Sequence, residues 1–269
     1  MSYKFTLIPS PPDPRDWKVK NVLKSKVLGI FPRLLPSAID YRDYLKTVRD
    51  QGNQGSCAAM AASAMKEFQE VKDVDFKDYM SPQFIYNNRE GYPNTEGMYT
   101  RDVLKILTNL GDCGESIFPY GSLGKPPQDA YDQARHYPIG GYAWCDTIDD
   151  LKLALYTNGP CLIAFPVYNF TGRFWKKNPG DYLLGYHMVL VCGYDNERFI
   201  IRNSWGEDWG DNGYTYFPYE DWGWQEEVAT TIDTDSDDYI PPTPDKSWFL
   251  KYWWILLIIA GIAIYFIVR

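Results

Sequence analysis

Cys57 is the residue of this chain with the clearest potential for chemistry. It follows a polar, glycine-bearing loop and opens a segment rich in alanine and methionine, residues 58–71, which predicts a helix. A thiol at the start of a helix faces free backbone N–H groups and the positive end of the helix dipole. We therefore expect the pKa of Cys57 to be lowered, which favours the nucleophilic thiolate over an inert buried cysteine.

Three further residues could complete a thiol-based site. Such catalysis needs an imidazole to pair with sulfur, a group to orient that imidazole and a hydrogen-bond donor for the oxyanion. His187, Asn203 and Gln51 are of the right types for these roles in turn. Alone, each would more simply be a packed histidine or a surface amide, so only their combination indicates a site.

The remaining soft ligands predict no metal site and no cofactor. The other four cysteines show no paired spacing, and the second histidine, His136, stands alone between Arg135 and Tyr137. An odd number of cysteines without a pairing pattern indicates free thiols in a reducing compartment. We interpret these four as buried structural residues.

Three sequence blocks resemble those of papain-like (cathepsin-type) cysteine peptidases. They read QGNQGSC at 51–57, GYHMV at 185–189 and NSWG at 203–206, in the family's order and with about 130 residues from Cys57 to His187. The resemblance covers residues 35–232. It implies an α+β fold of two lobes, one helical and one β-barrel-like, with a cleft between them. It also implies hydrolysis of protein or peptide substrates through a thioester.

The resemblance assigns a role to each matching position. Cys57 would attack as the thiolate, and His187 would be its imidazolium partner and then protonate the leaving amine. Asn203 would orient the imidazole, and Trp205 would shield their hydrogen bond from water. Gln51 would donate to the oxyanion together with the backbone N–H of Cys57.

The chain departs from the family pattern at the cleft. Ala58 stands where a tryptophan is usual, and Gln54 stands where a disulfide usually begins. The pair of glycines that binds substrate backbone is reduced to Gly97 and Met98, which we interpret as the substrate-binding pair.

Local signals predict helices early and strands late, as an α+β protein requires. Ser81 followed by Pro82 starts one helix, Thr100 caps a second that Gly111 ends, and Thr147 caps a third. Short β-branched and aromatic runs predict strands at Cys161–Val167, His187–Tyr194, Arg198–Asn203 and Gly213–Phe217.

Charge is distributed unevenly along the chain. Residues 1–33 carry 7 Lys/Arg against 2 Asp/Glu, whereas residues 34–232 carry 17 against 28. The acidic body argues against a nucleic-acid partner. The basic arm, residues 1–34, is a candidate short pro-segment that lies across the body and blocks the cleft. The alternative is an arm that packs along the lobes without inhibiting.

The C-terminal residues predict a tether followed by a membrane span. Residues 233–247 are acidic and proline-rich, which predicts an extended linker. Residues 248–268 are apolar with an aromatic belt, long enough to cross a lipid bilayer as a helix. A buried core helix is the alternative. Without a secretory signal peptide at the N-terminus, we expect a tail-anchored protein whose catalytic domain faces the cytosol.

Two other functions remain open at this stage. One is a catalytically silent homologue that serves as a structural or binding protein of a membrane or virion. The other is a different acyl transfer on the same thioester. The compact body and high tyrosine content resemble proteins of large DNA viruses, which makes a virion membrane or a host membrane the candidate location. The sequence predicts no oligomeric state.

Overall fold

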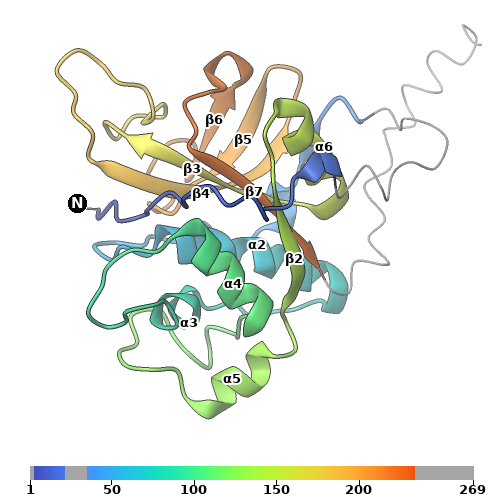
Figure 1. Ribbon diagram of the computed structural model, residues 1–269, viewed down its shortest axis with the longest axis vertical. Helices are drawn as coiled ribbons and strands as arrows, with labels where there is room; N and C mark the ends of the chain where they lie inside the picture. The colour runs from blue at the N-terminus through green and yellow to red at the C-terminus, as the bar shows by residue number, and fades with distance from the viewer. Residues whose placement is uncertain (1–2, 22–34, 234–269) are drawn as a thin grey trace, which may run out of the picture. The chain divides into compact units, whose positions relative to one another are not determined.

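The computed structural model describes residues 3–21 and 35–233, which belong to one compact unit of the chain (Figure 1). The helices are α2 (Cys57–Val74), α3 (Pro82–Asn87), α4 (Thr100–Asn109), α5 (Gln128–Ala134), α6 (Ile148–Asn158) and the short 3-10 turns η1 (Arg42–Tyr44) and η2 (Tyr219–Asp221). The strands are β1 (Ile39–Asp40), β2 (Ile139–Trp144), β3 (Cys161–Val167), β4 (Gly185–Tyr194), β5 (Arg198–Arg202), β6 (Tyr214–Pro218) and β7 (Glu227–Asp233). Helices precede most strands, which confirms the α+β prediction.

One antiparallel sheet forms the centre of this unit, with strand order β2-β7-β3-β4-β5-β6 and β1 beside β4. Both faces of its middle strands are covered. Along β3, Leu162 and Ala164 pack with α2, whereas Ile163 and Phe165 pack in the cluster that contains α6. Burial on both faces explains why the sequence of this strand is an unbroken run of apolar residues.

Two of the three expected helix caps are correct. The Ser81 hydroxyl accepts from the backbone N–H of Phe84 at 3.0 Å, and the Thr147 hydroxyl accepts from that of Asp150 at 3.1 Å. Thr100 is wrong as a cap, because it is the first residue of α4 and its hydroxyl donates to the carboxylate of Glu227. The cap position, with its extended backbone, is occupied by Tyr99 instead.

The sequence did not predict the outer strands β2 and β7. β7 continues to Asp233, so the predicted linker 233–247 begins one residue too early. Residues 234–247 and the predicted span 248–268 lie outside the described residues. Within the described ranges, no helix is long and apolar enough to cross a membrane.

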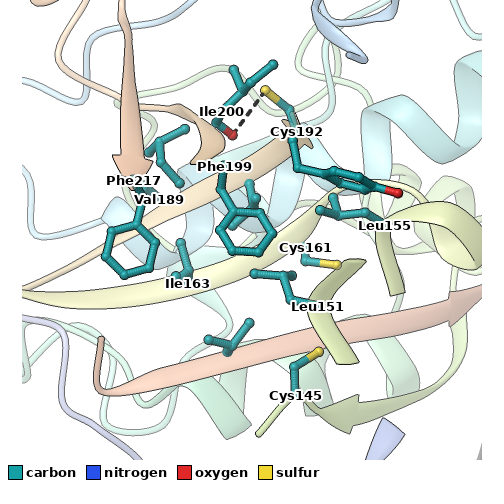
Figure 2. Packing of buried hydrophobic residues seen from close by; sticks show 14 of the residues in the cluster. Cys145, Leu151, Leu155, Cys161, Ile163, Val189, Cys192, Phe199, Ile200 and Phe217 are labelled. Atoms are coloured by element: carbon teal, nitrogen blue, oxygen red, sulfur yellow. Dashed lines mark hydrogen bonds between the residues drawn. The ribbon is translucent and has the colours of Figure 1, made fainter. Parts of the chain in front are cut away.

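The four cysteines expected to be structural are free and buried. Cys145, Cys161 and Cys192 lie among the apolar side chains between the sheet and α6 (Figure 2). Burial raises the pKa of Cys161 and that of Cys192 to about 12. These thiols therefore stay protonated at neutral pH and unreactive.

A buried cluster of charges joins α2 to the end of β7. The ammonium of Lys66 forms ion pairs with the carboxylates of Glu70 and Asp233 and also donates to the carbonyl of Pro138. Its side chain is fully buried. Each charge in the cluster depends on the others, because an unpaired buried charge is costly.

We expect Lys66→Met to lower the free energy of unfolding by about 3 kcal/mol, because it removes the buried cation with which Glu70 and Asp233 both pair. Lys105→Met is the matched control, since Lys105 forms only an exposed pair with Asp102 at 3.8 Å. The control should lose less than about 1 kcal/mol. Urea denaturation measures both, and equal losses would contradict a stabilising role for the cluster.

Candidate active site

The loop before α2 fixes the position of Cys57. The backbone N–H of Gln51 donates to the carbonyl of Ser204 at 2.9 Å, and the Ser204 hydroxyl donates to Gln51 Oε1 at 2.7 Å. Gln51 Nε2 donates to the carbonyl of Gln54 at 3.0 Å, which leaves its second N–H for another acceptor. The loop is thus fastened to the segment that follows Asn203.

His187 and Asn203 meet as the sequence predicts. His187 lies on β4 and Asn203 follows β5, and a distance of 2.7 Å separates His187 Nε2 from Asn203 Oδ1. The backbone N–H of Ser204 donates to the same Oδ1 at 2.8 Å, which identifies that atom as the oxygen. Nε2 is therefore the donor, and Nδ1 has no partner among the described residues. Nδ1 is the nitrogen available to the thiol.

Trp205 covers the histidine. Its indole stacks on the imidazole with ring centroids 4.7 Å apart and planes 24° apart, and it is 2% exposed. Trp205, predicted to shield the His187–Asn203 bond, thus lies against the imidazole.

The N-terminal arm lies over these residues. Thr6 pairs in parallel with Tyr186, and Ile8 pairs in parallel with Tyr99. The backbone N–H of Ile8 donates to the carbonyl of Met98 at 3.1 Å. In Figure 1 the arm, coloured dark blue, runs between β4 and the helices α2 and α4. It forms extended pairings with the chain on both sides.

Gly97 permits this close approach. Its φ is +77°, and a Cβ added there would lie 1.8 Å from the carbonyl oxygen of Thr6. Gly97 and Met98, predicted to bind substrate backbone, thus receive an extended segment of this same chain.

Apolar side chains of the arm cover the site. Tyr3 stacks on Trp205 with ring centroids 5.1 Å apart, and Phe5 meets the edge of His187 at 5.9 Å. Leu7, 3% exposed, belongs to the same apolar cluster as Cys57. Cys57 is 1% exposed. Water is excluded from both reactive side chains.

This covering reverses the expected pKa of the thiol. Burial raises the pKa of Cys57 to about 11, although backbone groups of Met188 and Leu7 oppose the shift. Burial likewise lowers the pKa of His187 to about 4, opposed by the hydrogen bond that its Nε2 donates to Asn203 Oδ1. The lowered thiol pKa predicted from the helix start is wrong for the covered protein, because desolvation outweighs the helix dipole. Both groups are neutral at pH 7.

Ion pairs join charged residues of the arm to the body. Lys4 pairs with Glu96 at 2.5 Å, and Lys18 pairs with Asp146 at 2.7 Å. These side chains are partly exposed, and such pairs contribute little. Asp16 of the arm pairs with Arg101 at 2.6 Å, and both of these side chains are largely buried. The most buried ion pair of the arm thus joins an acidic residue of the arm to a basic residue of the body, so the basic excess of the arm is not what docks it.

Three residues at the site were missed by the sequence reasoning. Ser204 fastens Gln51, while Thr100 and Glu227 bind each other where the arm leaves the cleft. Ser204 had one usable signal, its place beside Asn203. In the part of the chain that the structure describes, no group of three His, Cys, Asp or Glu residues could hold a metal ion.

Comparisons with known proteins point to one protease family. The model for papain family cysteine proteases matches residues 35–231. An uncharacterized peptidase C1-like protein of Acanthamoeba polyphaga mimivirus is 31% identical, over 82% of this chain and 83% of that protein.

Solved structures give the same result. The crystal structure of xylellain, a cysteine protease from Xylella fastidiosa, has a TM-score of 0.71 and 29% identity, over 86% of this chain and 96% of that chain. Procathepsin L2 from the larval midgut of Tenebrio molitor, at 23% identity, shares the fold with a TM-score of 0.67 over 86% of this chain and 78% of that chain.

Proposed function

The chain belongs to the papain family of cysteine proteases, and we propose that it is a thiol endopeptidase acting through Cys57, His187 and Asn203. The observation that best supports this is the 2.7 Å bond between His187 and Asn203 beneath Trp205, with the cleft filled by an extended peptide segment. A catalytically silent homologue is not favoured, because every group that the chemistry needs is present.

The first step is attack by sulfur on the substrate carbonyl carbon. The Cys57 thiol passes its proton to His187 Nδ1, and the thiolate adds to the carbonyl. The second N–H of Gln51 Nε2 and the backbone N–H of Cys57 donate to the oxyanion that forms. Asn203 accepts from Nε2 and stabilises the imidazolium.

The second step breaks the peptide bond. The His187 imidazolium gives its Nδ1 proton to the leaving amine, and the acyl group remains on Cys57 as a thioester. Water then attacks the thioester while Nδ1 takes the proton of the water. The acid leaves, and sulfur recovers a proton.

We also propose that residues 1–34 keep the site inactive. Because His187 protonates the leaving amine, the C-terminal part of a substrate would lie toward His187 and Trp205. The arm instead places its N-terminal residue Tyr3 at Trp205 and its later residue Ile8 at Met98. It runs opposite to a substrate, so its carbonyl and amide groups face the catalytic groups in reversed order.

The predicted span is a separate proposal. We propose that residues 248–268 tether the protease domain to a host or virion membrane through the linker, with the catalytic domain on the cytosolic side. The support is the apolar run and its aromatic belt.

A peptide that carries a thiol-directed electrophile tests the proposed chemistry. We expect it to label the full-length Leu7→Asp protein, hereafter the opened protein, because an aspartate buried against Cys57 displaces the arm. Mass spectrometry should locate the label on Cys57. Cys57→Ala should abolish labelling, and Cys113→Ala, at another buried thiol, should retain it. Labelling that survives Cys57→Ala would contradict the proposal.

A further inference from the structure

Gln51, the proposed oxyanion donor, is held through nearly all of its polar groups. Its backbone N–H and its Oε1 both bond to Ser204, and its Nε2 donates to the carbonyl of Gln54. Its backbone carbonyl accepts from the hydroxyl of Tyr120 at 2.9 Å. The second N–H of Nε2 remains for the oxyanion, so its direction depends on these bonds.

The Tyr120 hydroxyl also contacts the residue before Cys57. Its oxygen lies 2.6 Å from Oγ of Ser56, whose side chain is fully buried. A phenol has one proton, and that of Tyr120 goes to the carbonyl of Gln51, so Ser56 is the donor in this second bond. One hydroxyl thus links Gln51, which bears one oxyanion donor, to the residue that precedes the other donor, the backbone N–H of Cys57.

The bond to Tyr120 accounts for an unusual start of α2. Ser56 is the N-cap residue, where a serine hydroxyl usually accepts from a backbone N–H of the first turn, yet its side chain makes no such bond. Burial raises the pKa of Cys57, and the backbone N–H groups of Ala58 and of Cys57 itself act in the opposite direction. Tyr120 therefore keeps Ser56 away from N–H groups that favour the thiolate.

Tyr120 is held in place and keeps its proton. It lies in the loop between α4 and α5, and its backbone N–H donates to Glu115 Oε1 at 3.3 Å. Glu115 pairs with Arg49, two residues before Gln51. Burial raises the pKa of Tyr120 to about 12, while the hydrogen bond from Ser56 opposes the shift. At neutral pH the hydroxyl can therefore donate to Gln51.

We propose that Tyr120 is a positioning residue for the oxyanion donors, acting through Gln51 and Ser56 without touching the substrate. The inference rests on the proposed peptidase function. A neutral substrate carbonyl gains little from these donors, whereas the charge that develops on its oxygen in the transition state depends on their alignment. Loss of the Tyr120 hydroxyl should therefore lower kcat and leave KM nearly unchanged.

Steady-state hydrolysis by Tyr120→Phe in the opened protein tests this role. The change removes one oxygen and keeps the ring. We expect kcat to fall about 10-fold, less than the loss of an oxyanion donor itself, with KM within about 2-fold of the opened parent. Tyr131→Phe is the matched control, because the Tyr131 hydroxyl donates to Asn88 at 2.7 Å, outside the site, and its loss should leave kcat unchanged.

A double-mutant cycle with Gln51 separates positioning from a general loosening of the fold. Added to Gln51→Ala, Tyr120→Phe should lower kcat by only about 3-fold or less, because the Cys57 N–H is then the one donor left to align. An equal loss in both backgrounds, or a Tyr120→Phe protein with the kcat of the opened parent, overturns the proposal.

Titration with the thiol-directed electrophile counts the intact sites, so kcat refers to folded molecules. If Tyr120→Phe does not fold, Ser56→Ala takes its place. It removes the other end of the 2.6 Å contact and should lower kcat about 3-fold, and an unchanged kcat overturns the proposal.

The opened parent distinguishes this failure from failure of the peptidase function. Normal labelling and hydrolysis by the parent, with the same kcat in Tyr120→Phe, overturn the role of Tyr120 alone. Absence of both labelling and hydrolysis in the parent overturns the peptidase function and the role of Tyr120 together.

Discussion

The full-length Leu7→Asp protein should hydrolyse peptides on the order of 100-fold faster than the wild-type chain, since activity is scaled by the fraction of molecules whose site is uncovered. Leu7 is 3% exposed and packs with Cys57, so a carboxylate there cannot stay buried without a large cost. Ile8→Asp is the matched control. Ile8 is 42% exposed, so the same change at the next residue should leave the arm bound.

The pH dependence of alkylation gives a second readout of the same change. In the wild-type chain, the rate of reaction with a small alkylating reagent should rise only as the pH approaches the Cys57 pKa of about 11. In the opened protein, water and the His187 imidazolium would stabilise the thiolate, so the midpoint should move to lower pH. If the midpoint moved to higher pH instead, the added carboxylate would still lie beside the thiol and the arm would still be bound. A lower midpoint without faster hydrolysis would contradict inhibition by the arm.

Loss of the histidine should be the other large effect. In the opened protein, we expect His187→Ala to reduce kcat by about 10³-fold, because the thiol loses its base and the leaving amine loses its acid. Asn203→Ala should cost less, about 10-fold to 100-fold, because it removes only the group that orients the imidazole. Steady-state hydrolysis measures both.

Two comparisons make this prediction specific. His136→Ala should leave kcat unchanged, because His136 is exposed and lies outside the site. His187→Ala should also raise the pH at the midpoint of the alkylation profile. Asn203→Ala should raise it by a smaller amount. A His187→Ala protein that keeps both the rate and the profile of the opened parent would show that the imidazole takes no part.

The positions of the reactive residues could be predicted because local rules determine them. Cys57 starts a helix that its own sequence favours, and the blocks around His187 and Asn203 sit at a strand start and a strand end. The protonation state of Cys57 could not be predicted in this way. It depends on Leu7, fifty residues earlier, whose place over the thiol is a tertiary contact.

The same limit explains the errors at the edges of the fold. Thr100 is of a residue type that caps helices, yet it lies inside α4, where its hydroxyl donates to Glu227, 127 residues away. The predicted linker takes in Asp233, the last residue of β7, because that residue is acidic. Asp233 nevertheless pairs with Lys66. Lys66 belongs to α2, and no pattern within β7 indicates it.

The covalent connection of the arm to the domain has a kinetic consequence. As part of the same chain, residues 3–21 compete with substrate at an effective concentration that short tethers raise to the millimolar range. That competition does not depend on how much protein is present. A single cut within residues 22–34 would turn it into an ordinary association between two molecules, governed by concentration. After such a cut, dilution would release the arm and activate the protein. At high local concentration the arm would stay bound and the protein would stay inactive.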